Sequence, residues 1–244
     1  MKKLIALAVM TAVTVSMVCA QITVGAKGTF GMNLGSTLTD DGKTLFTMGY
    51  DIDTKNEVMV GGGGAIYGRY NMPFHTPLGV QLELGIFANN GVKVSADSSI
   101  EKASMKIGVE ATGSASYLSM DIPLIVTYDI SAGPVVITPL VGVNFSIPLG
   151  KMKSKMEYTA KMDGQVVEEG DFTEDVDIAS KFIPGIVAGV EVGLPLGPGS
   201  LVADLRYVND FTKFSIDPGV DGMDPVELGI RRNFNISVGY ALKF

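Results

Sequence analysis

The chain is poor in cysteine, histidine, tryptophan and charge. Its 244 residues include one cysteine, one histidine and no tryptophan, and charged residues make up 18% of it. An ordinary soluble domain has about 25% charged residues, so this composition is unusual for one. The formal net charge of −7 argues against nucleic acid as a partner, because nucleic acid selects clustered Lys and Arg.

Long apolar runs are missing beyond residue 20. No later segment has the ~18 uncharged apolar residues of a membrane helix. The chain starts Met-Lys-Lys and continues with an apolar stretch over 4–18, which is short for a membrane span. We expect residues 1–20 to be a signal peptide that is removed after Ala20. Lipidation of Cys19 is the alternative, but the bulky Val18 before it fits that processing poorly. Cleavage after Ala20 leaves no cysteine, which excludes disulfides and thiol chemistry.

Strict alternation of apolar and small or polar residues is what the chain has in abundance. In the last segment the apolar positions are Phe234, Ile236, Val238, Tyr240, Leu242 and Phe244. A period of two predicts a strand with different environments on its two faces. The spacing of Ser237, Gly239, Leu242 and Phe244 resembles the terminal signal that outer-membrane barrels present to the barrel-assembly machinery.

Seven earlier segments alternate in the same way. Together with the last one they cover residues 22–35, 57–71, 79–90, 115–130, 135–147, 182–194, 201–211 and 230–244. Short connections rich in Gly and Pro follow the second, fourth and sixth segments, and long ones cover 36–56, 91–114, 148–181 and 212–229. This asymmetry predicts an all-β fold, an eight-stranded antiparallel up-and-down transmembrane β-barrel over residues 21–244. Its turns would be short and periplasmic, its loops long and extracellular, and both chain ends periplasmic.

Aromatic residues on the apolar face mark both ends of these segments. Phe145, Phe182, Phe211 and Phe234 lie next to the long connections, and Tyr70, Tyr128, Tyr240 and Phe244 next to the short ones. Two aromatic belts around an aliphatic band are typical of strands that cross a membrane. A soluble lipid-binding barrel also alternates. Its outer face would carry many Lys and Glu, whereas the second face here is mostly Gly, Ala, Ser and Thr.

The second face carries a few charged residues of both signs. Those expected in the middle or periplasmic half of the strands are Lys27, Arg69, Glu83, Asp121, Glu191, Asp204 and Arg206, and the same register carries Asp129, Asp210 and Lys243. An eight-stranded barrel has an interior just wide enough for side chains, so charges inside it must pair. We expect a structural ion-pair plug; a gate over a narrow solute path is the alternative.

The connection over 148–181 has a basic first half and an acidic second half. The basic residues are Lys151, Lys153, Lys155 and Lys161, and the acidic ones are Glu168, Glu169, Asp171, Glu174, Asp175 and Asp177. Asp163-Gly164 between them is a strong hairpin signal. It predicts a protruding charge-paired ribbon with Lys153 opposite Glu174 and Lys155 diagonal to Glu174; the alternative is strand extension with solvated charges. Met152, Met156, Tyr158 and Met162 alternate along it as candidate extracellular contacts.

No pattern in the sequence supports catalysis, a cofactor or a metal site. His75 has no Ser or Asp nearby to form an activated pair. The glycines at 61–64 lack the Lys, the Ser or Thr and the helix of a phosphate loop, and predict a bend or a close contact instead. Asp217, Asp221 and Asp224 do not have the spacing of a calcium-binding loop. We therefore predict a protein that is not an enzyme.

The stretch over 117–128, Tyr-Leu-Ser-Met-Asp-Ile-Pro-Leu-Ile-Val-Thr-Tyr, is followed by a Gly-containing return segment over 135–148. This hairpin resembles the PorT-like outer-membrane β-barrel domain family. More broadly, the chain is similar to the eight-stranded OmpA/OmpX/OmpW group of small barrels. The resemblance implies the outer membrane of a diderm bacterium, with loops at the cell surface. The implied partners are outer-membrane lipid, the barrel-assembly machinery and an extracellular protein or host ligand.

The function that these expectations favour is a surface-exposed structural or interaction role carried by the extracellular loops. A narrow channel for small or apolar solutes, as in the OmpW group, is the first alternative. A soluble periplasmic barrel that binds lipid is the second.

Overall fold

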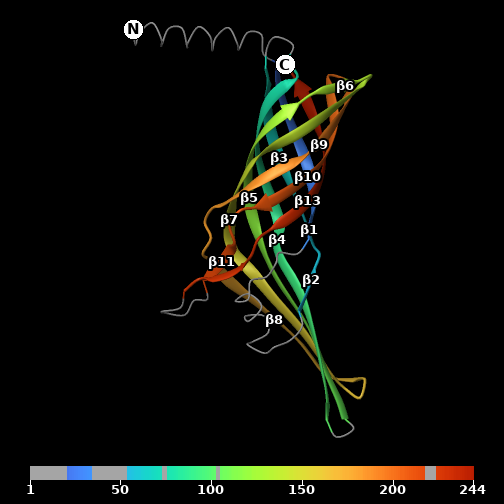
Figure 1. Cartoon of the computed structure of the whole chain (residues 1–244), viewed down its shortest axis with the longest axis vertical. Coiled ribbons are helices and arrows are strands. Elements are labelled where there is room, and N and C mark those ends of the chain that lie inside the picture. The colour runs from blue at the N-terminus through green and yellow to red at the C-terminus, as the bar shows by residue number, and fades with distance from the viewer. Residues whose placement is uncertain (1–20, 35–53, 73–75, 103–104, 218–223) are drawn as a thin grey trace.

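The computed structural model describes residues 21–34, 54–72, 76–102, 105–217 and 224–244 (Figure 1). All the regular secondary structure in this part of the chain is β-strand, and it contains no helix that is long and apolar enough to span a membrane. The strands are β1 (Gln21–Asn33), β2 (Thr54–Glu57), β3 (Met59–Asn71), β4 (Leu78–Lys102), β5 (Met105–Tyr128), β6 (Ile130–Ala132), β7 (Val135–Met162), β8 (Gln165–Ile178), β9 (Ile183–Leu196), β10 (Gly199–Asp210), β11 (Phe214–Asp217), β12 (Val226–Gly229) and β13 (Arg232–Lys243).

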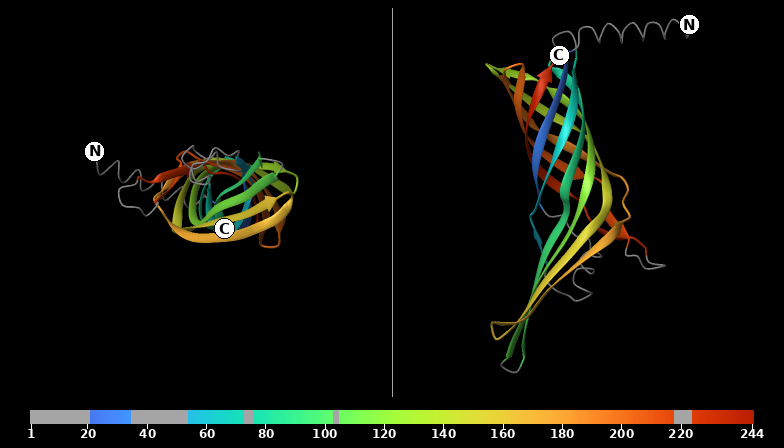
Figure 2. Two further views of the ribbon diagram at one scale, coloured as in Figure 1. Left: turned by 90° about the horizontal axis from the view of Figure 1, so that it is seen from below. Right: turned by 180° about the vertical axis from the view of Figure 1, so that it is seen from behind.

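Eight of these strands pair in a closed antiparallel circuit. The order is β1, β3, β4, β5, β7, β9, β10 and β13, and β13 pairs back with β1. The sheet therefore closes into a barrel, which Figure 2 shows from below and from behind. The eight strands correspond to the eight predicted segments. The expectation of only eight strands was wrong, because β2, β6, β8, β11 and β12 flank or extend the circuit.

The outer wall of the barrel is aliphatic and its inner wall is polar. Ile186, Val190 and Leu205 point outward and are 39%, 36% and 48% exposed. Glu191 and Arg206 point inward and are 3% and 5% exposed. Successive residues of a strand face opposite sides, so the facing of one position determines that of its whole strand. The predicted facing is confirmed.

The predicted aromatic residues stand on the outer wall at both ends of the barrel strands. Phe182 and Phe211 are exposed next to the long connections, and Tyr128 and Phe244 next to the short turns. The rings of Phe145 and Phe182 stack with centroids 5.5 Å apart. Large rings at the two ends of an aliphatic wall match the two-belt prediction.

The barrel end that holds Gln21 and Phe244 has tight turns. Ile22 and Phe244 exchange backbone hydrogen bonds, so the closing ladder is paired to the last residue. Gly197 connects β9 to β10 with φ +62°, and Gly133 connects β6 to β7 with φ +65°. Only glycine adopts these left-handed conformations without steric cost, which explains its place in both turns.

Beyond the opposite rim, β4, β5 and β7 continue and β8 joins them. We call this four-stranded sheet the ribbon; it comprises residues 92–102, 105–117, 152–162 and 165–178 (Figures 1 and 2). The long connections over 91–114 and 148–181 are therefore largely strand, as the protruding ribbon predicted for 148–181 requires. Their alternation continues past the rim, so the ladders that form in the barrel extend outward.

The hairpin at Asp163-Gly164 is confirmed, with both residues at positive φ, 51° and 83°. The predicted pairing of Lys153 with Glu174 was wrong by one residue. A bulge between Ala160 and Lys161 shifts the register, so that Lys153 lies opposite Asp175. An extra residue opposite a ladder position moves every later partner by one.

An apolar cluster fills the mouth of the barrel where the ribbon begins. It contains Val92, Val94, Ala115, Tyr117, Met152, Ile183, Phe214, Ile216 and Leu228. β11 and β12 pair with each other, and β11 pairs with the end of β8. The rings of Tyr117 and Phe214 stack at 4.4 Å. The β11–β12 hairpin thus contributes Phe214, Ile216 and Leu228 to an apolar plug at this end of the lumen.

Candidate functional site

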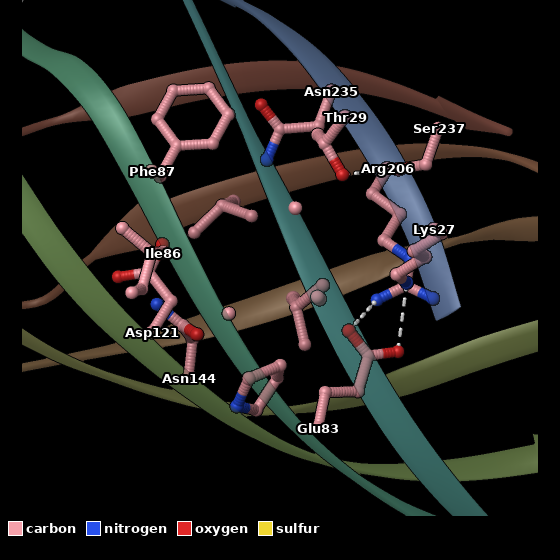
Figure 3. A pocket seen from close by; sticks show the side chains of 16 residues that line it. Lys27, Thr29, Glu83, Ile86, Phe87, Asp121, Asn144, Arg206, Asn235 and Ser237 are labelled. Carbon is pink, nitrogen blue, oxygen red and sulfur yellow. Dashed lines mark hydrogen bonds and ion pairs between the residues drawn. The ribbon is translucent and has the colours of Figure 1, made fainter. Parts of the chain in front are cut away.

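The centre of the lumen holds a buried four-residue ion-pair group from three strands. The Nζ of Lys27 on β1 lies 2.9 Å from Glu83 on β4 and 3.1 Å from Asp204 on β10. Arg206 on β10 lies 2.9 Å from Glu83, as Figure 3 shows, and 3.0 Å from Asp204. Each cation therefore contacts both carboxylates, and these contacts join β1, β4 and β10 inside the barrel. Buried charges are tolerated only with this kind of mutual pairing and hydrogen bonding.

Glycine makes room for this group in the adjoining wall. A Cβ on Gly25 would lie 2.5 Å from the ring of Tyr67, which leans over that position inside the barrel. The Nζ of Lys27 lies 5.6 Å from the centroid of the same ring. Gly63 within the run at 61–64 is similar, since a Cβ there would clash with the carbonyl oxygen of Ile86. The glycine run was predicted to allow a bend or the close contact of a bulky neighbour, whereas at Gly63 it is the backbone of the adjacent strand that comes close.

A second group lies toward the end with the short turns. Arg69 on β3 lies 2.5 Å from Glu191 on β9 and 3.7 Å from Asp129. The Nε of Arg69 also donates to Gln81, which in turn donates to Glu83. Gln81 thereby joins the two groups into one network. The predicted plug residues Lys27, Arg69, Glu83, Glu191, Asp204 and Arg206 all belong to it.

Asp121, the seventh predicted plug residue, belongs to a separate layer below the apolar plug. It lies 3.5 Å from Arg231, which forms a two-point contact with Asp210 at 2.9 and 3.1 Å. Beside this layer the Nδ2 of Asn233 donates to Asn90 at 3.1 Å. Sequence reasoning missed Arg231. Arg231 lies two residues before the inward-facing Asn233, so alternation along the chain predicts that its side chain also faces the lumen.

Two polar cavities lie inside the barrel around these groups. One, of about 60 Å³, is lined by Lys27, Glu83, Asp121, Asn144, Arg206 and Asn235, several of which point into it in Figure 3. The other, of about 80 Å³, lies around Arg69, Asp129 and Glu191. In the first, Asn144 Nδ2, Arg206 Nε and Asn235 Oδ1 are buried without a hydrogen-bond partner among the described residues. Polar cavities of this size with unpaired atoms have room for water.

The ribbon carries the predicted surface residues, with one exception. Tyr158 and Met162 are exposed and Met156 is partly buried, whereas Met152 is only 2% exposed and belongs to the apolar plug. Met152 as an extracellular contact was therefore wrong. It lies at the rim, where the barrel wall and the β11–β12 hairpin enclose it.

The predicted charge pairing of the ribbon is present only in part. Lys151 lies 3.3 Å from Asp177, as expected for opposed basic and acidic halves. Lys155 instead contacts Glu157 on its own strand, at 2.5 Å. This hydrogen bond from Lys155 lowers the pKa of the Glu157 carboxyl below its ordinary value. Lys161 contacts Glu110 on β5 rather than an acid on β8.

The residues of the proposed assembly signal occupy two faces of β13. Leu242 and Phe244 point outward and are exposed, while Ser237 is buried in the lumen. A Cβ on Gly239 would clash with the carbonyl oxygen of Ala26, so β13 needs glycine there to approach β1. Gly239 therefore has a structural role in closing the barrel, whatever its role in assembly.

Other candidate residues contribute no site. His75 and Asp221 lie outside the described residues. The described part of the chain contains no cluster of three or more His, Cys, Asp or Glu side chains arranged to hold a metal.

Comparisons with known proteins find similar folds but no family. No family model matches the chain, and no curated protein matches it either. The resemblance to the PorT-like family therefore stays an expectation. A major outer membrane protein from Thermus thermophilus is 16% identical, with 92% of this chain and 99% of that chain covered and a TM-score of 0.42. OprG from Pseudomonas aeruginosa is 14% identical, with 91% and 95% covered and a TM-score of 0.42. Neisserial surface protein A is 14% identical, with 91% and 97% covered and a TM-score of 0.37.

Proposed function

We propose that the chain is an integral outer-membrane β-barrel that is not an enzyme and that presents the ribbon at the cell surface for contact with a partner. The observation that carries the proposal is the inverted polarity of the barrel. Aliphatic side chains such as Leu82 and Val238 cover the outside, while Lys27, Glu83 and Arg206 are buried inside. Water outside the barrel would oppose this distribution on both walls, whereas hydrocarbon outside favours it.

The strand lengths fit a bilayer. β1 and β3 have 13 residues each, and β10 and β13 have 12. A tilted strand needs about 9–11 residues to cross the hydrocarbon core. Closure through the β1–β13 ladder leaves no unpaired edge inside the membrane, where unpaired backbone groups are costly. The soluble lipid-binding barrel is disfavoured because its outer wall would be this aliphatic surface in water.

The two ends of the barrel suggest its orientation. The end with the termini has tight turns, and the other end carries the ribbon. Short turns on the periplasmic side and long external segments are the rule in bacterial barrels. The ribbon would then extend from the cell, and both termini would be periplasmic. The implied partners are outer-membrane lipid, the barrel-assembly machinery during insertion, and an extracellular protein at the ribbon.

Membrane insertion and orientation can be tested together in a diderm host. We expect the full chain in the outer-membrane fraction to migrate differently in detergent gels before and after heating. Protease added to intact cells should cut near Asp163-Gly164, at the tip of the β7–β8 hairpin, and leave the barrel intact. An identical cut only after the outer membrane is opened would reverse the orientation. Absence of the heat-sensitive form from membranes would refute the barrel insertion itself.

A narrow channel is the second candidate function, and the two polar cavities favour it. Both are lined by residues of the ion-pair network, and the apolar plug lies at the barrel end where the ribbon begins. Removing the Phe214 ring, which stacks on Tyr117, should loosen that plug. If the lumen is a gated path, Phe214→Ala in planar bilayers should raise the frequency of conductance steps above wild type. If neither wild type nor Phe214→Ala gives conductance steps, the channel role is refuted and only the interaction role remains.

A further inference from the structure

Among the described residues, the outer edge of β8 is largely without a strand partner. One side of β8 pairs with β7 from Met152↔Val176 to Met162↔Gln165. On the other side, within the part of the chain that the structure describes, only Asp177 and Ile178 have partners, on β11. Residues 165–175 are exposed apart from Gly170, which is partly buried. A row of backbone N–H and C=O groups along most of β8 is therefore open to another strand.

This edge is strongly acidic. β8 reads QVVEEGDFTEDVDI, with six carboxylates and neither Lys nor Arg. Asp177 contacts Lys151, but no described cation forms a salt bridge with Glu169, Asp171 or Asp175. Glu157 of β7 lies directly opposite Asp171 in the ladder. Like charges that face each other across a ladder destabilise it. Lys155 contacts Glu157, and Lys153 lies opposite Asp175, so β7 offsets part of the acidic charge of this face. A cation on an added strand would offset more of it.

The two faces of β8 differ. Glu169, Asp171 and Asp175 share one face, since side chains alternate along a strand. Phe172 lies on the other face opposite Met156 and is 59% exposed. Val176 shares this face, and so do the carboxylates of Glu168 and Glu174. A strand that added to this edge would place alternate side chains beside the carboxylates and beside Phe172. Its matching sequence has basic residues at every second position and apolar residues between them.

We propose that the free edge of β8 binds an extended segment of a partner protein with alternating basic and apolar residues, by strand addition. Backbone pairing along the edge supplies affinity in this mode, and the alternating side chains supply specificity. The proposal rests on the proposed function, because it names the class of partner that the surface-exposed ribbon takes.

A second copy of the chain is a poorer occupant. Pairing two β8 edges would bring the carboxylates of one against those of the other, which is unfavourable at close range. The same charges protect the edge from uncontrolled aggregation, as charged edges do in soluble sheets. Pairing between two β8 edges is thus unfavourable, whereas pairing with a basic strand is favourable.

Binding can be measured on the full chain folded in detergent, with a synthetic peptide of about ten residues that alternates lysine and valine. We expect the triple variant Glu169→Gln, Asp171→Asn and Asp175→Asn to weaken binding about tenfold, since each exposed ion pair contributes modestly. The matched control Glu57→Gln, Asp97→Asn and Glu110→Gln removes as much charge from β2, β4 and β5, and should change binding less than about twofold. Heat-modifiable migration shows that each variant is folded.

Backbone pairing is tested with N-methylated peptides. Only every second amide of an added strand points at β8, so methyl groups on one parity should abolish binding and those on the other should spare it. Equal effects of both parities would reduce the contact to charge attraction and overturn the proposal. So would equal losses in the triple variant and its control, or no binding by the wild-type chain.

Two further outcomes distinguish failure of the strand-addition proposal from failure of the proposed surface role. If protease shows the ribbon on intact cells but the peptide does not bind, the strand-addition proposal fails and the surface role stands. If the peptide binds purified protein but the ribbon is periplasmic, the surface role fails and the edge site stands. Cross-linking between β8 strands of two copies, through Thr173→Cys, would assign the edge to self-association instead.

Discussion

The barrel and the ribbon share the three long strands β4, β5 and β7, yet the barrel buries its ion pairs and the ribbon exposes them. Within the barrel, the salt bridges of β4 and β10 involve side chains that are 2–5% exposed, as in Arg206–Glu83 and Arg206–Asp204. Where the ribbon begins, Lys151 and Asp177 are 55% and 68% exposed. The period of the sequence is the same in both regions. What differs is the medium outside the sheet, which we infer to be lipid at the barrel and water at the ribbon.

The comparison shows how one alternating pattern serves two purposes. A closed sheet has an inside, so the polar register becomes a buried network and the apolar register a membrane surface. The ribbon does not close, so its two faces and, among the described residues, most of its β8 edge remain available. We therefore place stability in the barrel and recognition in the ribbon, and the following substitutions test that division.

The largest effect should come from breaking a buried ion pair, and an exposed ion pair serves as the comparison. Arg231→Gln leaves Asp210 and Asp121 facing each other in the lumen without their cation. We expect a loss of about 3–5 kcal/mol in the free energy of unfolding. Lys151→Gln in the ribbon should cost at most about 1 kcal/mol. Urea titrations in lipid vesicles measure both. Similar costs at the two sites would break the distinction between barrel and ribbon.

The next largest effect should come from an arginine on the outer wall of the barrel, and an arginine on the surface of the ribbon serves as the comparison. Val190→Arg puts a charge on the aliphatic wall near mid-strand and should destabilise the inserted barrel by about 2–4 kcal/mol. Val166→Arg, at an exposed position of the ribbon, should stay within about 0.5 kcal/mol of wild type. The same vesicle titrations compare them. Normal folding and insertion of Val190→Arg would contradict lipid contact at that wall.

Deletion of Phe244 should act on assembly rather than on the finished barrel. Phe244 is 73% exposed, and its backbone pairs only with Ile22 at the end of the ladder. We expect slower appearance of the heat-modifiable form in cells, with the free energy of unfolding within about 0.5 kcal/mol of wild type. Phe182→Ala, which removes another exposed ring, serves as the control. An unchanged assembly rate after the deletion would remove Phe244 from the signal.

The smallest effect is a pH dependence of the ribbon. Lys155 lowers the pKa of the Glu157 carboxyl, so this pair contributes stability above the unfolded pKa of about 4.3. That contribution is lost as pH falls through the lowered pKa of the folded state. Lys155→Gln should bring the pKa of Glu157 back toward its ordinary value, measured by NMR titration of labelled glutamate. An unchanged pKa would mean that the contact is absent in solution.

Much of the barrel followed from parity alone. Once alternation assigned Val190 to one face, it assigned Glu191 to the other, and the structure agrees. The same rule brought Lys27, Glu83 and Arg206 into one lumen before any contact was known. Their partners did not follow, because pairing depends on the stagger between strands that are distant in sequence. Arg231 was missed because its strand was judged by its apolar residues.

The ribbon was predicted as a hairpin but not in its register or extent. Asp163-Gly164 determined the turn, since both residues tolerate positive φ. The bulge at Ala160 and Lys161 then displaced Lys153 from Glu174 to Asp175, and no local pattern marks it. Met152 shows the same limit from another side. Alternation assigned Met152 to one face of its strand. Only the position of the β11–β12 hairpin, which packs against Met152, shows that the side chain is buried there.

The sequence by itself determined which residues share a face, where the chain turns back and which two walls a closed sheet would have. Those properties depend on neighbours along the chain, and a period of two with glycine at turns encodes them locally. The tertiary structure alone decided which carboxylate meets which cation, that most of the outer edge of β8 has no partner strand among the described residues, and that Phe214 reaches across to Tyr117. Those depend on stagger, bulges and packing between strands far apart in sequence, where the free energy is shared among many contacts and no single segment carries it.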